Sequence, residues 1–283
     1  MDYTARRHYR HIEVSPIGSA LGAVVRGVDI ARPLAHEIVA EIRQAFLDHL
    51  VVFIRDQKLT PQAQIAFAQR FGQPMGYPQL KGLPEYPLVT PVVKLEHERV
   101  NFGGVWHSDT SYLARPPMAS MLYAMETPPR GGDTLFANQY LAYETLSEGL
   151  QQTLAGLVGV NSSAKADVSK TREDRLRDAG AELKVLIGEH PVVRTHPETG
   201  RKALYVNFGH TAQFRGWTEQ ESAPLLDTLF LHQVQPEFTC RFHWEPGSLA
   251  FWDNRCAMHN PINDYHGFRR VMHRVTLAGD TPR

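Results

Sequence analysis

Two hydrophobic periodicities alternate in the first third of the chain. Over residues 36–50 apolar positions recur at helical spacing, and the unbroken apolar run 51–54 that follows is typical of a buried strand. Shortly after it, Thr60 and Pro61 form the pattern of a helix N-cap followed by proline at the first helical position. Gly72 supplies a stop signal about three turns later, so a second helix is predicted between Thr60 and Gly72.

The rest of the chain changes to short β-rich runs separated by Gly, Pro, Asn and Asp. Between them, Thr218 and Glu221 fit a capping box, which predicts one further helix lying over the strands. Many short strands of this kind favour a sandwich or a jelly roll. The fold class that we expect is therefore mainly β with flanking α-helices. The predicted strands cover residues 118–124, 191–195, 203–206, 238–244, 249–252 and 271–277.

Nothing in the sequence divides the chain, because it contains no repeat, no low-complexity tract and no linker rich in proline or serine. We therefore predict one domain spanning residues 1–283. Within it, residues 164–184 are rich in charged side chains and poor in large apolar ones, which indicates a mobile surface segment. We expect this segment to form part of a lid over the functional site, with a plain surface loop as the alternative.

The composition excludes several classes of protein. A chain of 283 residues with 42% hydrophobic side chains can bury a sizeable core, and 30 basic against 30 acidic residues leave no net charge for nucleic-acid binding. No apolar stretch approaches the roughly 20 residues that a membrane span needs. Residues 1–10 lack the apolar part of a secretory signal, so we expect a cytoplasmic protein with no membrane partner. Cys240 and Cys256 are expected to be reduced.

A candidate metal site lies in the segment Trp106-His107-Ser108-Asp109. In an extended segment residues i and i+2 point to the same side, so His107 and Asp109 can share one ion. His259 is a candidate for the third ligand. Two imidazoles and one carboxylate leave adjacent coordination positions open, as in non-haem Fe(II) oxygenases. Taken singly, each of these residues is also typical of a hydrogen-bonded core or turn position, which is the alternative interpretation.

Two arginines follow the last candidate ligand. Arg270 and Arg274 share one face of a predicted strand, because successive side chains alternate between the two faces. An arginine inside a sandwich is costly unless an anion pairs with it, and guanidinium binds a carboxylate bidentately. A dicarboxylate such as 2-oxoglutarate would fit, with its keto-acid end on the metal and the Thr134 hydroxyl near its other carboxylate. The alternative is that both arginines form ordinary ion pairs with Asp264 or Asp253.

Six ordered motifs make the sequence recognisable. They are Val51 to Gln57, Trp106 to Asp109, Gly131 to Thr134, Val192 to Pro197, Trp252 to Arg255 and Arg270 to Arg274. On these motifs, and over nearly its whole length, the chain resembles the taurine dioxygenase and 2,4-dichlorophenoxyacetate dioxygenase family of Fe(II)/2-oxoglutarate enzymes. The resemblance implies a double-stranded β-helix, or jelly roll, in which His107, Asp109 and His259 hold the iron.

The resemblance also implies a cosubstrate site and a reaction. Thr134 and Arg270 would bind the far carboxylate of 2-oxoglutarate, and Arg274 would lie between the cosubstrate and the anionic group of the substrate. With O2, 2-oxoglutarate would be converted to succinate and CO2 while a substrate carbon is hydroxylated. The expected cofactors are therefore Fe(II), 2-oxoglutarate and O2.

The substrate segment departs from the pattern of the taurine enzymes of this family. These hold the sulfonate with a His, and touch the amine with a Tyr, just after the Phe-Gly that ends the second helix. An ungapped comparison puts Tyr77 and Leu80 at those positions, and apolar Phe102 follows Asn101 in the loop before the metal pair. We therefore predict a substrate with an anionic head and a less polar body, bound by Tyr77, Asn101 and Arg274. Alkyl sulfonates, sulfate esters and aryloxyalkanoates fit this description, and taurine is the alternative.

Two other classes of protein use similar features. A zinc hydrolase also employs two His and one carboxylate, but HExxH, GxSxG and GxxxxGK are absent from the sequence. A non-catalytic jelly-roll protein that binds a small ligand would not need two arginines on one strand face beside a metal site. Because members of the family are often dimers or tetramers, we expect a homo-oligomer.

Overall fold

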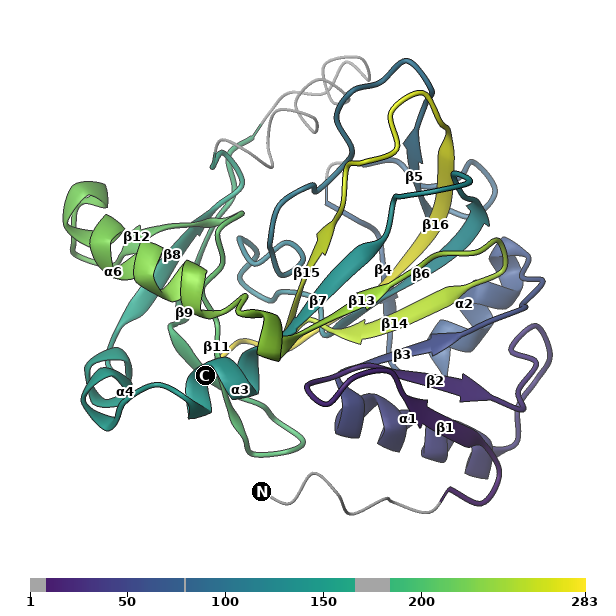
Figure 1. The fold of residues 1–283 in the computed structure, drawn as a ribbon, viewed down its shortest axis with the longest axis horizontal. Helices are drawn as coiled ribbons and strands as arrows, with labels where there is room; N and C mark the ends of the chain where they lie inside the picture. The colour runs from purple at the N-terminus through teal and green to yellow at the C-terminus, as the bar shows by residue number, and fades with distance from the viewer. Residues whose placement is uncertain (1–8, 79, 166–183) are drawn as a thin grey trace.

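The computed structural model describes residues 9–78, 80–165 and 184–283. Two β-sheets face each other at its centre (Figure 1). The larger sheet has the order β1 (Glu13–Pro16), β2 (Ala23–Arg26), β3 (Val51–Ile54), β14 (Leu249–Asp253), β6 (Ala119–Glu126), β16 (Arg270–Leu277) and β4 (Pro74–Met75), and β5 (Thr90–Lys94) also pairs with β16. The smaller sheet has the order β13 (Thr239–Phe242), β7 (Thr134–Asn138) and β15 (Ala257–Pro261). The two sheets confirm the predicted jelly roll.

Two helices cover the outer face of the larger sheet, and local sequence explains both. Helix α1 (His36–His49) ends where Leu50 adopts a left-handed backbone with φ 63°, and β3 begins at the next residue. Helix α2 (Pro61–Gln69) begins at Thr60, whose hydroxyl accepts a hydrogen bond from the backbone N–H of Ala63 at 3.1 Å. Both predicted helices and the predicted strand between them are confirmed.

Aromatic side chains fill the space on both sides of the larger sheet. On the outer face, Phe46 of α1 stacks on Phe251 of β14 with ring centroids 4.1 Å apart. On the inner face, Phe53 of β3 stacks on Phe242 of β13 at 3.9 Å and meets Phe136 of β7 at 5.6 Å. Successive strand residues therefore alternate between the helix-covered layer and the layer between the sheets.

A second group of elements lies beside the two sheets, on the left in Figure 1. It contains a three-stranded sheet, a two-stranded hairpin and the helices that pack on them. The sheet has the order β12 (Thr211–Phe214), β8 (Val158–Ser162) and β9 (Ile187–Pro191), and β10 (Val193–Thr195) pairs with β11 (Lys202–Leu204). The helices are α3 (Gln139–Glu144), α4 (Glu148–Leu154), α6 (Glu219–His232) and the 3-10 turn η1 (Pro236–Phe238).

Two predictions in this second group can be compared with the structure. Helix α6 has both reciprocal hydrogen bonds of a capping box between Thr218 and Glu221, as predicted. The run 191–195, predicted as one strand, instead contributes to two sheets that meet at Val192. The backbone of Val192 donates to Leu157 and accepts from Tyr205, so the chain leaves β8 there and joins β11. The predicted lid, residues 164–184, lies outside the described residues over 166–183.

Candidate metal centre and adjoining pockets

The structure brings His107, Asp109 and His259 together between the two sheets. A backbone bridge does this: the N–H of His107 donates to the carbonyl of His259 at 3.0 Å, and the reverse hydrogen bond is 2.9 Å. The segment around His107 is thereby fixed to β15. The Oδ1 atom of Asp109 lies 3.6 Å from Nε2 of His107 and 3.8 Å from Nε2 of His259. All three side chains are buried, with at most 5% of each residue exposed.

The donor atoms of this cluster are oriented toward a common point. Nδ1 of His107 lies 2.7 Å from the carbonyl of Val105, which fixes the proton on Nδ1 and leaves the lone pair on Nε2. Within the described chain, Oδ1 of Asp109 has no hydrogen-bond partner although it is buried. Burial, and then the neighbouring His107, hold the pKa of His259 well below its ordinary value of 6.5, so its ring is neutral. Two imidazole nitrogens and one carboxylate oxygen without a partner among the described residues fit a divalent metal.

The second oxygen of Asp109 is held by the protein. Ser120 in β6 donates its hydroxyl to Oδ2 of Asp109 at 2.6 Å, and the amide of Asn254 donates to Ser120 at 3.1 Å. Arg274 forms an ion pair with the same oxygen, Oδ2. Burial opposes ionisation of Asp109, but the guanidinium of Arg274 outweighs it and keeps the pKa of Asp109 well below the ordinary 3.8. Oδ1 therefore stays ionised and available to a ligand.

The supporting roles of Ser120 and Asn254 were not predicted from the sequence. Ser120 is the only serine or threonine in β6 and is fully buried, and a small hydroxyl side chain at a buried strand position was an available signal. Asn254 lies in a motif that we singled out only by resemblance. The side-chain Oδ1 of Asn254 accepts a hydrogen bond from the indole N–H of Trp252 at 2.9 Å, so the tryptophan helps to orient the amide.

The first pocket adjoins the candidate metal centre and contains the predicted cosubstrate residues. Thr134, Arg270 and Arg274 all line it, together with His107 and His259. The guanidinium of Arg270 is buried, and its Nε and Nη2 atoms have no hydrogen-bond partner among the residues described. Burial lowers the pKa of Arg270, with the phenol of Tyr265 acting in the opposite direction. The remaining lining residues are Val92, Phe102, Leu122, Phe136, Trp244, Trp252 and Pro261.

The alternative ion pairs that we considered for the two arginines are not formed in the described part of the chain. Asp253 is bonded by Arg255, with 2.8 Å from Nε to Oδ1 and 2.7 Å from Nη2 to Oδ2. Asp264 accepts from the backbone of Gly132 at 2.7 Å. The buried guanidinium of Arg270 has the phenol of Tyr265 as a neighbour but no ion pair among the described residues, and therefore calls for an anion from outside the protein.

A second pocket shares Arg274 with the first. Its lining includes the predicted substrate residue Tyr77, whose ring lies 4.9 Å from the Arg274 guanidinium carbon. Asn101, the other predicted substrate residue, is buried and donates to the carbonyl of Pro261 at 3.0 Å, which ties the loop to the end of β15. The structure places Asn101 beside the pockets and not in their lining. The other lining residues are Leu80, Lys81, Thr90, Pro91, Val92 and Phe102.

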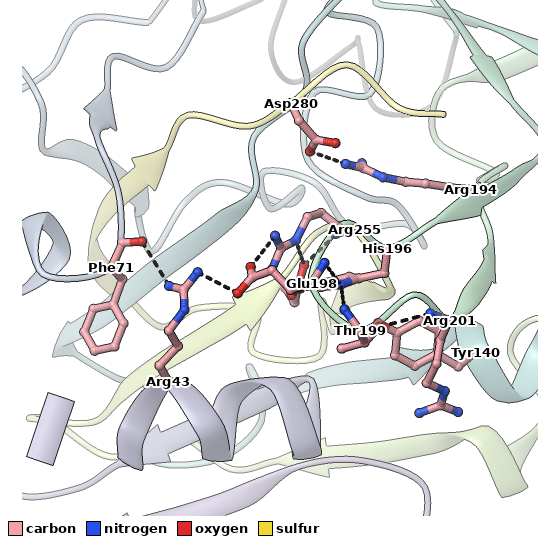
Figure 2. Close-up of polar contacts among 11 residues, drawn as sticks. Arg43, Phe71, Tyr140, Arg194, His196, Glu198, Thr199, Arg201, Arg255 and Asp280 are labelled. Carbon is pink, nitrogen blue, oxygen red and sulfur yellow. Dashed lines mark hydrogen bonds and ion pairs between the residues drawn. The ribbon is translucent and has the colours of Figure 1, made fainter. Parts of the chain in front are cut away.

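A second buried group, His196, Asp253 and Cys256, also has the residue types of a metal site. Nδ1 of His196 accepts from the backbone N–H of Glu198 and of Thr199 at 3.2 and 3.1 Å, so the proton must be on Nε2, which lies 3.0 Å from Asp253. Arg255 also binds Glu198 at 2.7 Å, and Glu198 binds Arg43 of α1 at 2.7 Å (Figure 2). This group is saturated by internal hydrogen bonds and ties α1 to the turn that leads into β15.

Comparison with known proteins decides the family. The profile described as "Taurine catabolism dioxygenase TauD, TfdA family" matches residues 13–276. The chain belongs to this family. As a TauD, TfdA family member it is an α-ketoglutarate-dependent dioxygenase, an oxidoreductase that uses 2-oxoglutarate and O2, which confirms the resemblance found in the sequence. Within the described ranges, no helix of this dioxygenase is long and apolar enough to cross a membrane.

Three relatives are similar to this TauD, TfdA family dioxygenase over most of its length. A protein of Pseudomonas putida named "Alpha-ketoglutarate-dependent sulfate ester dioxygenase" is 34% identical, over 97% of this chain and 92% of its own length. A crystal structure of "a Taurine Dioxygenase from Burkholderia xenovorans" is 39% identical, with a TM-score of 0.82 and coverage of 96% and 93%. The crystal structure of "AAD-2 in complex with Mn(II) and N-oxalylglycine" is 27% identical, with a TM-score of 0.83 and coverage of 96% and 99%.

Proposed function

We propose that this enzyme hydroxylates a small anionic organic substrate at an Fe(II) centre held by His107, Asp109 and His259. The observation that carries the proposal is the position of three potential metal ligand atoms within 4.8 Å of one another, beside the buried guanidinium of Arg270, whose Nε and Nη2 have no hydrogen-bond partner among the described residues. When bound, the ferrous ion would supply the activation of O2, since the three ligands leave adjacent positions open. Overall, substrate, 2-oxoglutarate and O2 give hydroxylated substrate, succinate and CO2.

The cosubstrate would lie in the first pocket. Arg270 supplies the charge for the far carboxylate, and Thr134 on the facing sheet supplies a hydroxyl, which is oriented by the indole N–H of Trp244 at 2.9 Å. Its keto-acid end would reach the metal ligands that line the same pocket. The mainly apolar walls exclude water from the reacting groups. A similar structure is a complex with Mn(II) and N-oxalylglycine, in which an N–H replaces one CH2 of 2-oxoglutarate, and this supports the binding of a metal and of 2-oxoglutarate.

The second pocket indicates the substrate class. Arg274 and Lys81 both line it, and none of its described lining residues carries a carboxylate. The rest of its wall includes the apolar or aromatic side chains Tyr77, Leu80 and Phe102. An anionic head with a less polar body fits this lining, as in an alkyl sulfonate, a sulfate ester or an aryloxyalkanoate. If the hydroxylated carbon carries the heteroatom, the product collapses to a carbonyl compound and releases the anionic fragment.

Taurine is the second candidate, because one similar structure is that of a protein named as a taurine dioxygenase. Its ammonium group would lie in a pocket that contains Arg274 and Lys81 and no described carboxylate, which opposes its binding. The name of the sulfate ester relative favours the less polar substrates. The homo-oligomer and the cytoplasmic location remain predictions, which light scattering and cell fractionation test.

Two measurements on the purified enzyme test the proposal. Addition of Fe(II) and 2-oxoglutarate without O2 should give a weak visible charge-transfer band that Zn(II) does not give. With O2, succinate should form faster with a sulfate ester, an alkyl sulfonate or an aryloxyalkanoate than with taurine. Absence of the band would refute the metal centre, and fastest turnover of taurine would refute the substrate class.

A further inference from the structure

Lys94 is a buried cation that no part of the proposed function employs. It is the last residue of β5, and its register partner on β16 is Arg270. Side chains of directly paired residues lie on the same side of a sheet, so Lys94 shares the face of Arg270. Val92 on β5 and Arg274 on β16 lie on this face too, and both line the pockets beside the candidate metal centre. The face is therefore the inner one, and only 2% of Lys94 is exposed.

The ammonium group of Lys94 has no hydrogen-bond partner in the described ranges. It lies 4.5 Å from the centre of the Tyr265 ring, a contact with an aromatic face that does not satisfy its three N–H donors. Its neighbour Arg270 likewise has two unpartnered nitrogens among the described residues. Two like charges directly opposite each other in a sheet repel, and both lose hydration on burial, so this pair needs an anion.

The nearby carboxylates are already engaged. Asp133 accepts from Arg241 at 2.6 Å and has Nδ1 of His243 at 2.8 Å. One oxygen of Asp264 accepts the backbone hydrogen bond of Gly132 at 2.7 Å, and the other faces Arg241 at 3.9 Å. Neither forms an ion pair with Lys94 in the part of the chain that the structure describes. With the Nζ of Lys94 and two nitrogens of Arg270 left without partners in the described ranges, a ligand can supply the neutralising anion.

We propose that Lys94 and Arg270 together bind the far carboxylate of 2-oxoglutarate. This inference rests on the proposed function, because it places the cosubstrate in the first pocket. A carboxylate has two oxygens that can each accept more than one hydrogen bond, so Arg270, Lys94 and the hydroxyl of Thr134 can share it. The second cation makes the site selective for dicarboxylate keto acids, because a monocarboxylate would leave two buried charges opposed.

Replacement of Lys94 by methionine tests the proposal, because it keeps the length and apolar stem of the side chain and removes the charge. Binding is measured without O2 from the Fe(II) band, with 2-oxoglutarate and with 2-oxopentanoate, the five-carbon keto acid that lacks the far carboxylate. Loss of one charge-assisted hydrogen bond should weaken the binding of 2-oxoglutarate about 10- to 100-fold. Binding of 2-oxopentanoate should stay equal or improve, so the preference between the two acids falls by the same factor.

Two controls separate this proposal from its alternatives. Lys202→Met changes an exposed lysine on β11, and should leave both affinities unchanged. If wild-type enzyme gives no band at all, the proposed function fails before Lys94 is tested. If Lys94→Met weakens the binding of both keto acids equally, or changes the binding of neither, Lys94 supports only the fold and the inference is wrong.

A milder substitution keeps the test valid if Lys94→Met does not fold. Lys94→Gln retains N–H donors without the charge, and should lower the preference for 2-oxoglutarate over 2-oxopentanoate by a smaller factor. An unchanged preference in this folded variant would overturn the proposal. Thermal unfolding without metal gives an independent readout: 2-oxoglutarate or glutarate alone should raise the Tm of wild-type enzyme more than that of Lys94→Gln.

Discussion

Two buried His and Asp clusters in this enzyme have similar residue types and different surroundings. In the cluster of His196 and Asp253, both carboxylate oxygens are bonded by Arg255, and both ring nitrogens of His196 have partners. In the cluster of His107, Asp109 and His259, Oδ1 of Asp109 faces Nε2 of both histidines and has no hydrogen-bond partner within the described residues. Saturation of donors and acceptors, more than residue type, therefore separates a structural cluster from a candidate metal site.

Replacement of His259 by alanine should have the strongest consequence, which is the loss of metal chemistry. The change removes one of the three proposed ligands, and loss of even an outer partner of a metal ligand costs about 10- to 100-fold in metal affinity or activity. We therefore expect the Fe(II) band to disappear and succinate formation to fall by more than about 100-fold. Iron content after gel filtration and a succinate assay measure this. Retention of iron at the wild-type level would contradict the assignment of His259.

The saturated cluster should show the opposite behaviour. Asp253→Ala leaves the buried guanidinium of Arg255 without its main partner, which should lower the free energy of unfolding by about 3–5 kcal/mol. Urea unfolding of the metal-free protein measures the loss. Folded Asp253→Ala at low temperature should still bind Fe(II), because its change lies outside the three ligand atoms. If this variant loses iron while its stability is unchanged, Asp253 belongs to the metal site and the two clusters have exchanged roles.

Ser120→Ala tests how far the hydrogen bonds around Asp109 support the proposed metal site. It removes the hydroxyl that donates to Oδ2 of Asp109 at 2.6 Å, while the ion pair with Arg274 remains. Iron affinity should fall about 10-fold, at the lower end of the range for outer partners of metal ligands. An iron titration against a competing chelator measures the change, and Ser120→Thr, which restores the hydroxyl, should recover most of it. Equal affinity in Ser120→Ala would show that Arg274 alone positions Asp109.

A more modest effect concerns pH. Burial first, and then His107, hold the pKa of His259 below 6.5, so below this pH the unfolded chain binds a proton that the native chain does not. Stability of the metal-free enzyme should therefore fall as the pH drops from 6.5, by up to about 1.4 kcal/mol per pH unit for this one group. Between pH 7 and pH 5, the free energy of unfolding in urea should fall less steeply for His259→Ala than for the wild-type enzyme. The difference in slope should be up to about 1.4 kcal/mol per pH unit. Parallel curves would contradict the lowered pKa.

The part of the fold set by local signals was predictable from the sequence. The cap at Thr60, the capping box at Thr218 and the apolar run 51–54 each depend on neighbouring residues alone, and each appears in the structure. The exchange of sheets at Val192 was not predictable in this way. It depends on hydrogen bonds to Leu157 and Tyr205, whose positions the local sequence does not determine.

In the candidate site, too, local sequence predicted some features, whereas contacts between distant segments were not predictable from it. His107 and Asp109 were paired from their spacing, whereas the approach of His259 depends on a backbone bridge between distant segments, for which only the resemblance gave a reason. The partner of Lys94 was invisible in the sequence, because it is set by the register of β5 on β16. The contact of Arg274 with Asp109 was missed for a similar reason: strand periodicity gives the face of a side chain, but not what it meets there.

Anomalous diffraction at the iron edge, from crystals grown without O2 in Fe(II) and 2-oxoglutarate, would locate the metal itself. We predict one strong peak at about 2.0–2.2 Å from Nε2 of His107, Nε2 of His259 and Oδ1 of Asp109, the usual range for nitrogen and carboxylate ligands. A peak at His196 and Asp253 instead, or no ordered iron at His107, would contradict the assignment of the metal centre.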